Sequence, residues 1–184
     1  MGKEQRAILL YGSNIWYLGE GMLGPLFAVF AEQVGGDVLE ITWAWATYLI
    51  VGGVLHILFG KIIDQGYSKE KMMMLGYALN ALFTFGYLFV SSPLHLLIVQ
   101  AGLGVAAALA TPTWDALYAK YEDRKHDTYE WGISEGTALI VTGAAIILGG
   151  VVVTQYSFQT LFIVMGSIQT IATIYQARIL RKRA

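Results

Sequence analysis

Cysteine is absent from the 184 residues, and only three residues are proline. Without cysteine the chain can form no disulfide framework, thiol nucleophile or cysteine-based metal site. Charged residues are also scarce, at 14%, where a soluble domain has about 25%. Hydrophobic residues make up 56% of the chain. This balance argues against a soluble enzyme, and also against a disordered or nucleic-acid-binding protein.

The sequence contains no recognisable metal-ligand cluster, phosphate-binding loop or nucleophile–base pair. Gly102 and Gly104 form a Gly-x-Gly pair, but they lie within an apolar stretch. No strand precedes them, which argues against a nucleotide site. We therefore expect no enzyme activity, no catalytic residue, no bound metal and no cofactor.

The mean hydropathy of +0.56 comes from long apolar blocks. Blocks of about 20 residues are typical of membrane-spanning helices, whereas the strands of a membrane barrel alternate over about 10 residues. The sequence predicts six spanning helices, over residues 7–30, 41–59, 72–90, 94–118, 131–153 and 158–177. Six spans leave only short loops, so we expect an all-α membrane protein with a single six-helix domain over residues 1–184.

The basic residues all fall on one side of these predicted spans. They lie before the first span, between the second and third, between the fourth and fifth, and after the sixth: Lys3, Arg6, Lys61, Lys69, Lys71, Lys120, Arg124, Lys125, Arg178, Arg181, Lys182 and Arg183. The loops at 33–40, 91–93 and 155–157 hold none. Loops rich in lysine and arginine stay in the cytoplasm. The pattern predicts a multi-pass protein of the inner or plasma membrane with both termini cytoplasmic, and it argues against dual topology.

The two halves of the chain show a weak internal match at an offset of 90 residues. Residues 49–53 match 139–143, Gly60 matches Gly150, Gly76 matches Gly166, and Pro25 matches Pro112 at an offset of 87. Three spans per copy is an odd number, so the copies would point in opposite directions. The match predicts the inverted three-plus-three repeats of secondary transporters, over about 7–90 and 94–178.

The loop after the second span carries a partial motif. Residues 60–71 read GKIIDQGYSKEK. This resembles the Gly-x-x-x-Asp-Arg-x-Gly-Arg/Lys-Arg/Lys loop of the major facilitator superfamily, with Gly60, Asp64 and Lys69 at matching positions. Gln65 stands where the family has arginine, and two further positions differ. Residues 100–112 also resemble the fourth helix of that superfamily.

The resemblance implies two six-helix halves around a central cavity, with alternating access, and this chain resembles the amino-terminal half. In that superfamily the halves are parallel repeats, which the one-sided basic loops allow. We expect a parallel homodimer that lies in the lipid bilayer and transports a small molecule, with no nucleic-acid partner. The alternatives are an amino-terminal half that needs a different, complementary half, a non-transporting membrane module, and a proton or water channel.

The family geometry also implies contacts between the halves, because it places helices 2 and 5 against the opposite half. Gly132 and Gly136 have the small-xxx-small spacing that lets helices approach closely, although glycine is common in membrane helices. Asp64 of one copy would cap the start of helix 5 of the other copy, since helix N-termini attract carboxylates. Gly60 and Lys69 belong to the same contact or gating region. The alternative for Asp64 is a solvated loop acid.

Three acids lie within predicted spans: Glu20, Asp115 and Glu135. A charge at the centre of a spanning helix costs about 2.5–3.5 kcal/mol on insertion scales, so intramembrane acids are candidates for function. Glu20 is near the middle of the first span and is expected to bind a proton or a cationic substrate. Its alternative role is a protonated structural acid. The other substrate- or proton-binding candidates, on the two cavity-lining helices, are Ser13, Asn14, Trp16, Tyr17, Thr111 and Trp114.

The other two acids lie nearer the cytoplasmic side. Asp115 is expected to pair with one of the loop lysines (Lys61, Lys69 or Lys120). Glu135 is expected one turn into the fifth helix, where an acid is favourable. Gating is the alternative role for both. They are therefore assigned to contacts or gating, and not to catalysis.

No lysine or arginine lies inside a predicted span. This disfavours an anionic substrate, which needs a fixed cation as its partner. An acid among aromatic side chains suits a neutral or cationic organic molecule, through ion pairing and cation–π contacts. Proton-linked movement of such a molecule is the analogue within the superfamily. Antiporters of that superfamily carry a Gly-Pro motif in helix 5, which residues 143–150 lack.

Overall fold

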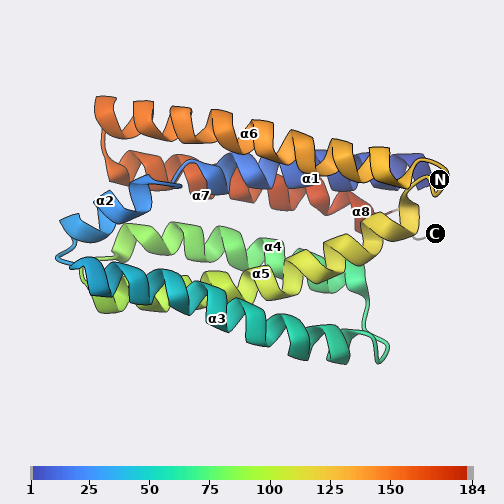
Figure 1. Ribbon diagram of the computed structural model, residues 1–184, viewed down its shortest axis with the longest axis horizontal. Coiled ribbons are helices and arrows are strands. Elements are labelled where there is room, and N and C mark those ends of the chain that lie inside the picture. Colours follow the sequence, from blue (N-terminus) through green and yellow to red (C-terminus); the bar gives the residue numbers. More distant parts are fainter. Residues whose placement is uncertain (1, 182–184) are drawn as a thin grey trace.

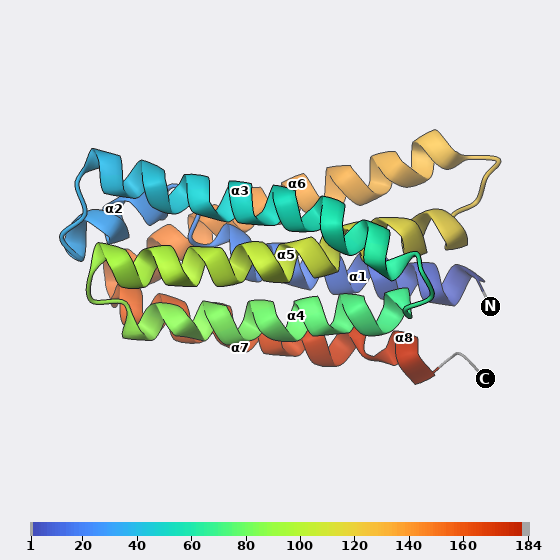
Figure 2. The same ribbon diagram turned by 90° about the horizontal axis from the view of Figure 1, so that it is seen from below.

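The computed structural model describes residues 2–181, which form α-helices, one short 3-10 helix and no strand. In chain order the elements are α1 (Gly2–Gly21), α2 (Leu26–Gln33), α3 (Val38–Ile63), α4 (Lys69–Gly86), η1 (Tyr87–Phe89), α5 (Pro93–Tyr121), α6 (Asp127–Gln155), α7 (Phe158–Gln176) and α8 (Arg178–Arg181). The long helices run side by side in one bundle (Figures 1 and 2).

The start of α1, the end of α8, the α3–α4 loop and the α5–α6 loop lie at the same end of the bundle (Figure 1). Every lysine and arginine that the structure describes lies in or beside these segments, so we call this the basic end. Lys182 and Arg183 lie outside the described residues. The grouping agrees with the one-sided pattern in the sequence, and the cytoplasmic placement of this end stays a prediction.

Polar caps define where several helices begin. The Asp37 side chain accepts a hydrogen bond from the Glu40 backbone N–H, and the Glu40 carboxylate accepts one from the Asp37 N–H. This reciprocal capping box starts α3. Ser68, Ser92 and Ser157 each accept a hydrogen bond from a backbone N–H three residues later, at the starts of α4, α5 and α7. These caps satisfy N–H groups that have no partner within the helix.

The first predicted span is not one continuous helix, and the prediction over residues 7–30 is wrong in this respect. The α1 helix ends at Gly21, and α2 begins at Leu26. Between them Gly24 has a φ of +24°, which glycine adopts most readily, and Pro25 lacks a backbone N–H. Together α1 and α2 run the length of the bundle (Figure 1).

The remaining five predicted spans correspond to the long helices of the bundle. Within residues 2–181, five helical segments are each long and apolar enough to cross a membrane, namely those at 38–63, 69–89, 93–121, 127–155 and 158–181. The α6 helix begins at Asp127, earlier than the predicted residue 131, and carries Asp127 and Glu130 in its first turn. Acids in that position are favourable because they face the positive end of the helix dipole.

The helices pack in an order that differs from their order in the chain. The α5 helix packs along α3 and α4, α1 packs along α6 and α7, and α4 packs against α7. If α1, α3 and α4 are exchanged with α5, α6 and α7, in that order, the same pairs of helices are in contact. Inverted repeats would produce this pattern, although the repeat itself stays a prediction.

The core lies along the middle of the bundle, and two helices contribute little to it. In the most apolar 18-residue window of each helix, 61% of residues are buried in α5, but only 17% in α6 and 11% in α3. Towards the end opposite the basic end, Phe30, Tyr87 and Phe162 pack ring against ring. The α3 and α6 helices therefore flank the bundle with largely bare apolar faces.

Candidate functional site

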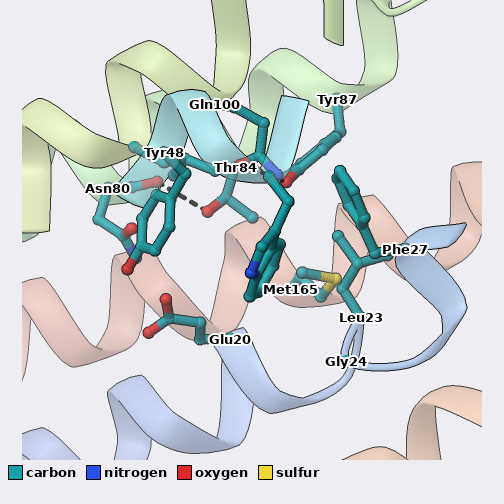
Figure 3. Close-up of a pocket in the computed structure, with 12 residues that line it drawn as sticks. Glu20, Leu23, Gly24, Phe27, Tyr48, Asn80, Thr84, Tyr87, Gln100 and Met165 are labelled. Atoms are coloured by element: carbon teal, nitrogen blue, oxygen red, sulfur yellow. Dashed lines mark hydrogen bonds between the residues drawn. The ribbon is translucent and has the colours of Figure 1, made fainter. Parts of the chain in front are cut away.

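A cavity of about 100 Å³ lies among α1, α3, α4, α5 and α7. Its polar lining residues are Glu20, Tyr48, Asn80, Thr84, Tyr87 and Gln100, and Figure 3 shows the Glu20 carboxylate pointing into it. We call this cavity the Glu20 pocket. The Asn80 side chain is 3% exposed, and its Nδ2 has no hydrogen-bond partner. A buried donor without a partner costs free energy. A water molecule or a ligand in this pocket would supply the missing acceptor for Asn80 Nδ2.

Three other polar side chains of the Glu20 pocket, those of Thr84, Tyr87 and Gln100, form hydrogen bonds. The Thr84 hydroxyl donates to the Asn80 carbonyl at 2.7 Å, and the Tyr87 hydroxyl donates to Gln100 Oε1 at 3.4 Å (Figure 3). These bonds keep the polar side chains at fixed positions on the wall. The opposite part of the wall is apolar and aromatic, and includes Phe27 and Trp45. The pocket therefore combines one carboxylate with neutral polar groups and aromatic rings.

A smaller cavity of about 40 Å³ lies nearer the basic end. It is lined by Ser13, Trp16, Tyr17, Thr111, Trp114 and Asp115, together with Tyr77 and Ala110. We call it the Trp114 pocket. It unites five of the seven residues that the sequence predicts for substrate or proton binding, and Glu20 lies in the neighbouring pocket. The seventh, Asn14, faces the other way and donates a hydrogen bond to Thr137 of α6.

Trp16 connects the two pockets. Its ring lines the Trp114 pocket and lies edge-on to Tyr77, with 4.5 Å between ring centroids. Its indole N–H donates a hydrogen bond to the Glu20 carboxylate. The protonation state of Glu20 and the position of Trp16 are therefore linked, because the ionised carboxylate is the stronger acceptor.

Neighbouring helices fix the backbone of α1 around these residues. Gln169 Nε2 of α7 donates to the Trp16 carbonyl at 2.9 Å, and the Trp114 indole N–H of α5 donates to the Leu9 carbonyl at 3.2 Å. At the basic end, Arg6 pairs with Glu130 of α6 at 2.5 Å. The helix that carries Glu20 is thus tied to α5, α6 and α7.

The three acids predicted within spans share one open face of the bundle. Glu20, Asp115 and Glu135 are all exposed. Tyr17 is near enough to each of them to interact electrostatically. We call Glu20, Asp115 and Glu135 the acidic face. No lysine or arginine lines either pocket within the part of the chain that the structure describes.

Two expectations for these acids are wrong. Asp115 does not pair with a loop lysine: Lys69 binds Asp64 instead, and Asp115 interacts electrostatically with Glu135 and His56. Glu135 does not lie one turn into its helix, because α6 begins earlier, at Asp127. Asp115 and His56 come together because α5 and α3 pack along each other, which the sequence of a single helix does not reveal.

The residues assigned to gating or inter-half contact are exposed or partly exposed. Asp64 is the residue that follows α3, and one of its oxygens binds Lys69 Nζ at 2.7 Å. A Cβ atom added at Gly60, Gly132 or Gly136 would meet no atom within 4 Å. These glycines therefore make no close approach to another helix of this chain, and their contact with a second unit stays a prediction.

Sequence reasoning missed most of the Glu20 pocket. Tyr48, Asn80, Thr84, Tyr87 and Gln100 come from four elements, α3, α4, η1 and α5, that the sequence does not place beside α1. A signal was present, because Asn80 and Thr84 are polar residues one turn apart in an apolar span. Among the described residues, no group of three or more histidine, aspartate or glutamate side chains could hold a metal ion.

Known proteins resemble the chain over nearly its whole length. A curated transporter of Methanocaldococcus jannaschii, itself described as an uncharacterised MFS-type transporter, is 26% identical over 180 residues, which are 95% of this chain and 45% of that protein. The multidrug resistance protein MdtG of Salmonella typhimurium is 24% identical over 89% of this chain and 41% of its own length. An uncharacterised MFS-type transporter of Bacillus subtilis is 18% identical over 79% of this chain and 88% of its own length.

The chain thus spans about half the length of the first two relatives, at 45% and 41%, and most of the third. The sequence profile of the Major Facilitator Superfamily matches residues 9–183. With its apolar spanning helices, the chain is a multi-pass membrane protein of a family whose members transport solutes and are not enzymes. The chain belongs to the Major Facilitator Superfamily.

Proposed function

We propose that this chain is one half of a secondary active transporter, and that it works as a parallel homodimer by alternating access. Its substrate is a cationic or neutral small organic molecule, and its movement is linked to protons. The basic end faces the cytoplasm. The observation that carries the proposal is the acidic face, with Glu20 directed into a pocket of aromatic and neutral polar side chains.

The charges support the substrate class. A carboxylate beside aromatic rings offers ion pairing and cation–π contacts to an organic cation. The lack of lysine and arginine in both pocket linings leaves an anion without a partner. Glu20 gives up its proton or its cation within a mostly apolar bundle, where an intramembrane acid is expected to serve function. The name of MdtG, a multidrug resistance protein, fits a substrate that is an organic molecule.

The bare faces of α3 and α6 support assembly with a second unit. Glycines on both helices face open space: Gly53, Gly60, Gly132, Gly136, Gly143 and Gly150. Small residues allow the close helix approach that stabilises association in membranes. The acidic face is also exposed, so a second unit would turn it into the wall of a closed cavity. The Bacillus subtilis relative, of which this chain covers 88%, supports a unit of this length.

Transport itself tests the proposal. We expect purified protein in liposomes to move ethidium, a fluorescent organic cation, with a rate that saturates and depends on an imposed pH gradient. Fluorescein, an organic anion, is the matched control and should not be moved. Flux that does not saturate would indicate a channel instead. Ethidium movement that is no faster than in empty liposomes, with or without the gradient, would contradict the proposal and favour a non-transporting module.

Disulfide cross-linking tests the parallel homodimer. Gly60 lies near the end of α3 and Gly132 near the start of α6, so both glycines are at the same depth, at the basic end. The chain has no cysteine of its own, and a disulfide requires Cα atoms within about 7 Å. We expect a chain with Gly60→Cys and Gly132→Cys to give a covalent dimer when membranes are oxidised.

The matched control places the second cysteine at the opposite end of α6, as Gly60→Cys with Gly150→Cys. Gly150 is as open as Gly132, but a parallel dimer holds it far from Gly60 of the other copy. Cross-linking of this control pair, and not of the first pair, would show an antiparallel arrangement. No cross-link with either pair would contradict an α3–α6 interface between copies.

A further inference from the structure

Two adjoining hollows form a groove on the outer surface of α1, α6 and α7. The first has a volume of about 480 Å³, and its apolar lining includes Ile15, Leu18, Val141 and Ala144. The second has a volume of about 400 Å³ and lies nearer the basic end, against α8. Tyr11 and Tyr175 line both hollows, so the two lie side by side. We call them together the lateral groove.

The groove changes character along its length. In the first hollow Asn14 is the one polar residue besides the two tyrosines among the described lining residues, and it donates a hydrogen bond to Thr137. The second hollow adds Arg178 and Arg181, and Glu4 is the one acid among its described lining residues. The groove thus runs from an apolar slot at the level of the spanning helices to a positively charged mouth at the basic end.

Among the described residues, Arg178 and Arg181 form no ion pair, in contrast to Arg6. Arg6 is committed to Glu130 of α6 by an ion pair. The guanidinium of Arg178 lies over the ring of Tyr175, 4.5 Å from its centroid, and both Arg178 and Arg181 are exposed. Stacking of this kind holds a guanidinium in place and leaves its N–H groups available for a phosphate.

We propose that the lateral groove binds an anionic phospholipid, with one acyl chain between α1, α6 and α7 and its phosphate at Arg178 and Arg181. The fit rests on charge complementarity at the mouth and on the apolar slot beside it. Basic pockets between spanning helices bind anionic headgroups, and an acyl chain in the slot covers the apolar surface of α1 between α6 and α7. This lipid site is distinct from the Glu20 pocket and does not depend on the transport proposal.

Fluorescence quenching tests the site with defined lipids. Because the chain has no cysteine, Ala144→Cys provides a single position for a bimane label within the slot. We expect phosphatidylglycerol with brominated acyl chains to quench this label at a several-fold lower mole fraction than brominated phosphatidylcholine does. A label at Leu82→Cys, exposed on α4, serves as the control and should be quenched equally by both lipids.

Substitutions at the mouth connect the preference to the arginines. The double variant Arg178→Gln and Arg181→Gln should lose the preference for phosphatidylglycerol, whereas the lysine versions of both should retain most of it. Replacing Arg124 and Lys125 by glutamine removes the same charge from the α5–α6 loop at the basic end, and should change nothing. Equal quenching of the Ala144→Cys label by both lipids would overturn the proposal. So would the absence of quenching by either lipid, which would indicate that a second chain covers the slot. A preference for phosphatidylglycerol that persists in the Arg178→Gln and Arg181→Gln double variant would also overturn it.

Discussion

Glu20→Gln is expected to reduce proton-driven ethidium transport to the background rate. Glutamine has nearly the shape of glutamate and can still accept the hydrogen bond from the Trp16 indole, but it cannot take up or release a proton. Binding of the organic cation should also weaken by about tenfold, because one charged partner worth about 1.5 kcal/mol is lost. Glu20→Asp keeps the charge and should retain part of the transport.

The measurement is gradient-driven flux in liposomes, together with ethidium binding to the purified protein. Glu32→Gln is the matched control, since Glu32 is an exposed acid of α2 away from both pockets. Both variants should show the same thermal stability as the unmodified chain. Full coupled transport by Glu20→Gln would exclude Glu20 as the proton carrier, whereas failure of the unmodified chain to transport would contradict the transporter proposal itself.

Gly149→Ala is expected to destabilise the protein by about 3 kcal/mol, at the upper end of the range for overpacking. A Cβ atom at Gly149 would fall on the carbonyl group of Met22, with the carbonyl carbon only 2.8 Å away. Backbone atoms cannot turn aside as a side chain can. Relief therefore requires α6 to separate from the turn between α1 and α2, which lies directly after the segment that carries Glu20.

The adjacent residue gives the control. A Cβ atom at Gly150 would meet nothing within 4 Å, so Gly150→Ala should be neutral or slightly stabilising, as alanine is favoured over glycine in a helix. Thermal unfolding in detergent should show a melting temperature about 10 °C lower for Gly149→Ala. Equal melting temperatures for the two variants would contradict the close contact between α6 and the helix break.

The sequence predicts the spanning helices well because each one is identified by the hydropathy of its own continuous stretch of residues. The stretch over 131–153 is apolar enough to identify α6, and serine and aspartate caps mark where the others begin. The break in the first span is different. Gly24 and Pro25 are visible in the sequence, but many spanning helices accommodate proline without a break, as α5 does with Pro112.

The site was harder to predict because it depends on which helices lie beside one another. Trp16 and Thr111 line the same pocket, and both lie on helices that the superfamily resemblance places around the cavity; their role in binding stays a prediction. Asn80 and Gln100 were missed because their meeting with Glu20 depends on the packing order of α1, α4 and α5. The direction of Asn14, towards α6, also depends on that order.

The bare faces of α3 and α6 have a different meaning in a bilayer than they would in water. Lipid tails are as apolar as the leucine and isoleucine side chains on these helices, so exposing them to lipid costs almost nothing. Van der Waals packing, hydrogen bonds between helices and lipid entropy then favour pairing, and the partners diffuse within the plane of the membrane. The degree of association through these faces therefore depends on the number of copies per lipid molecule. The strength of the association is measured by varying the protein-to-lipid ratio.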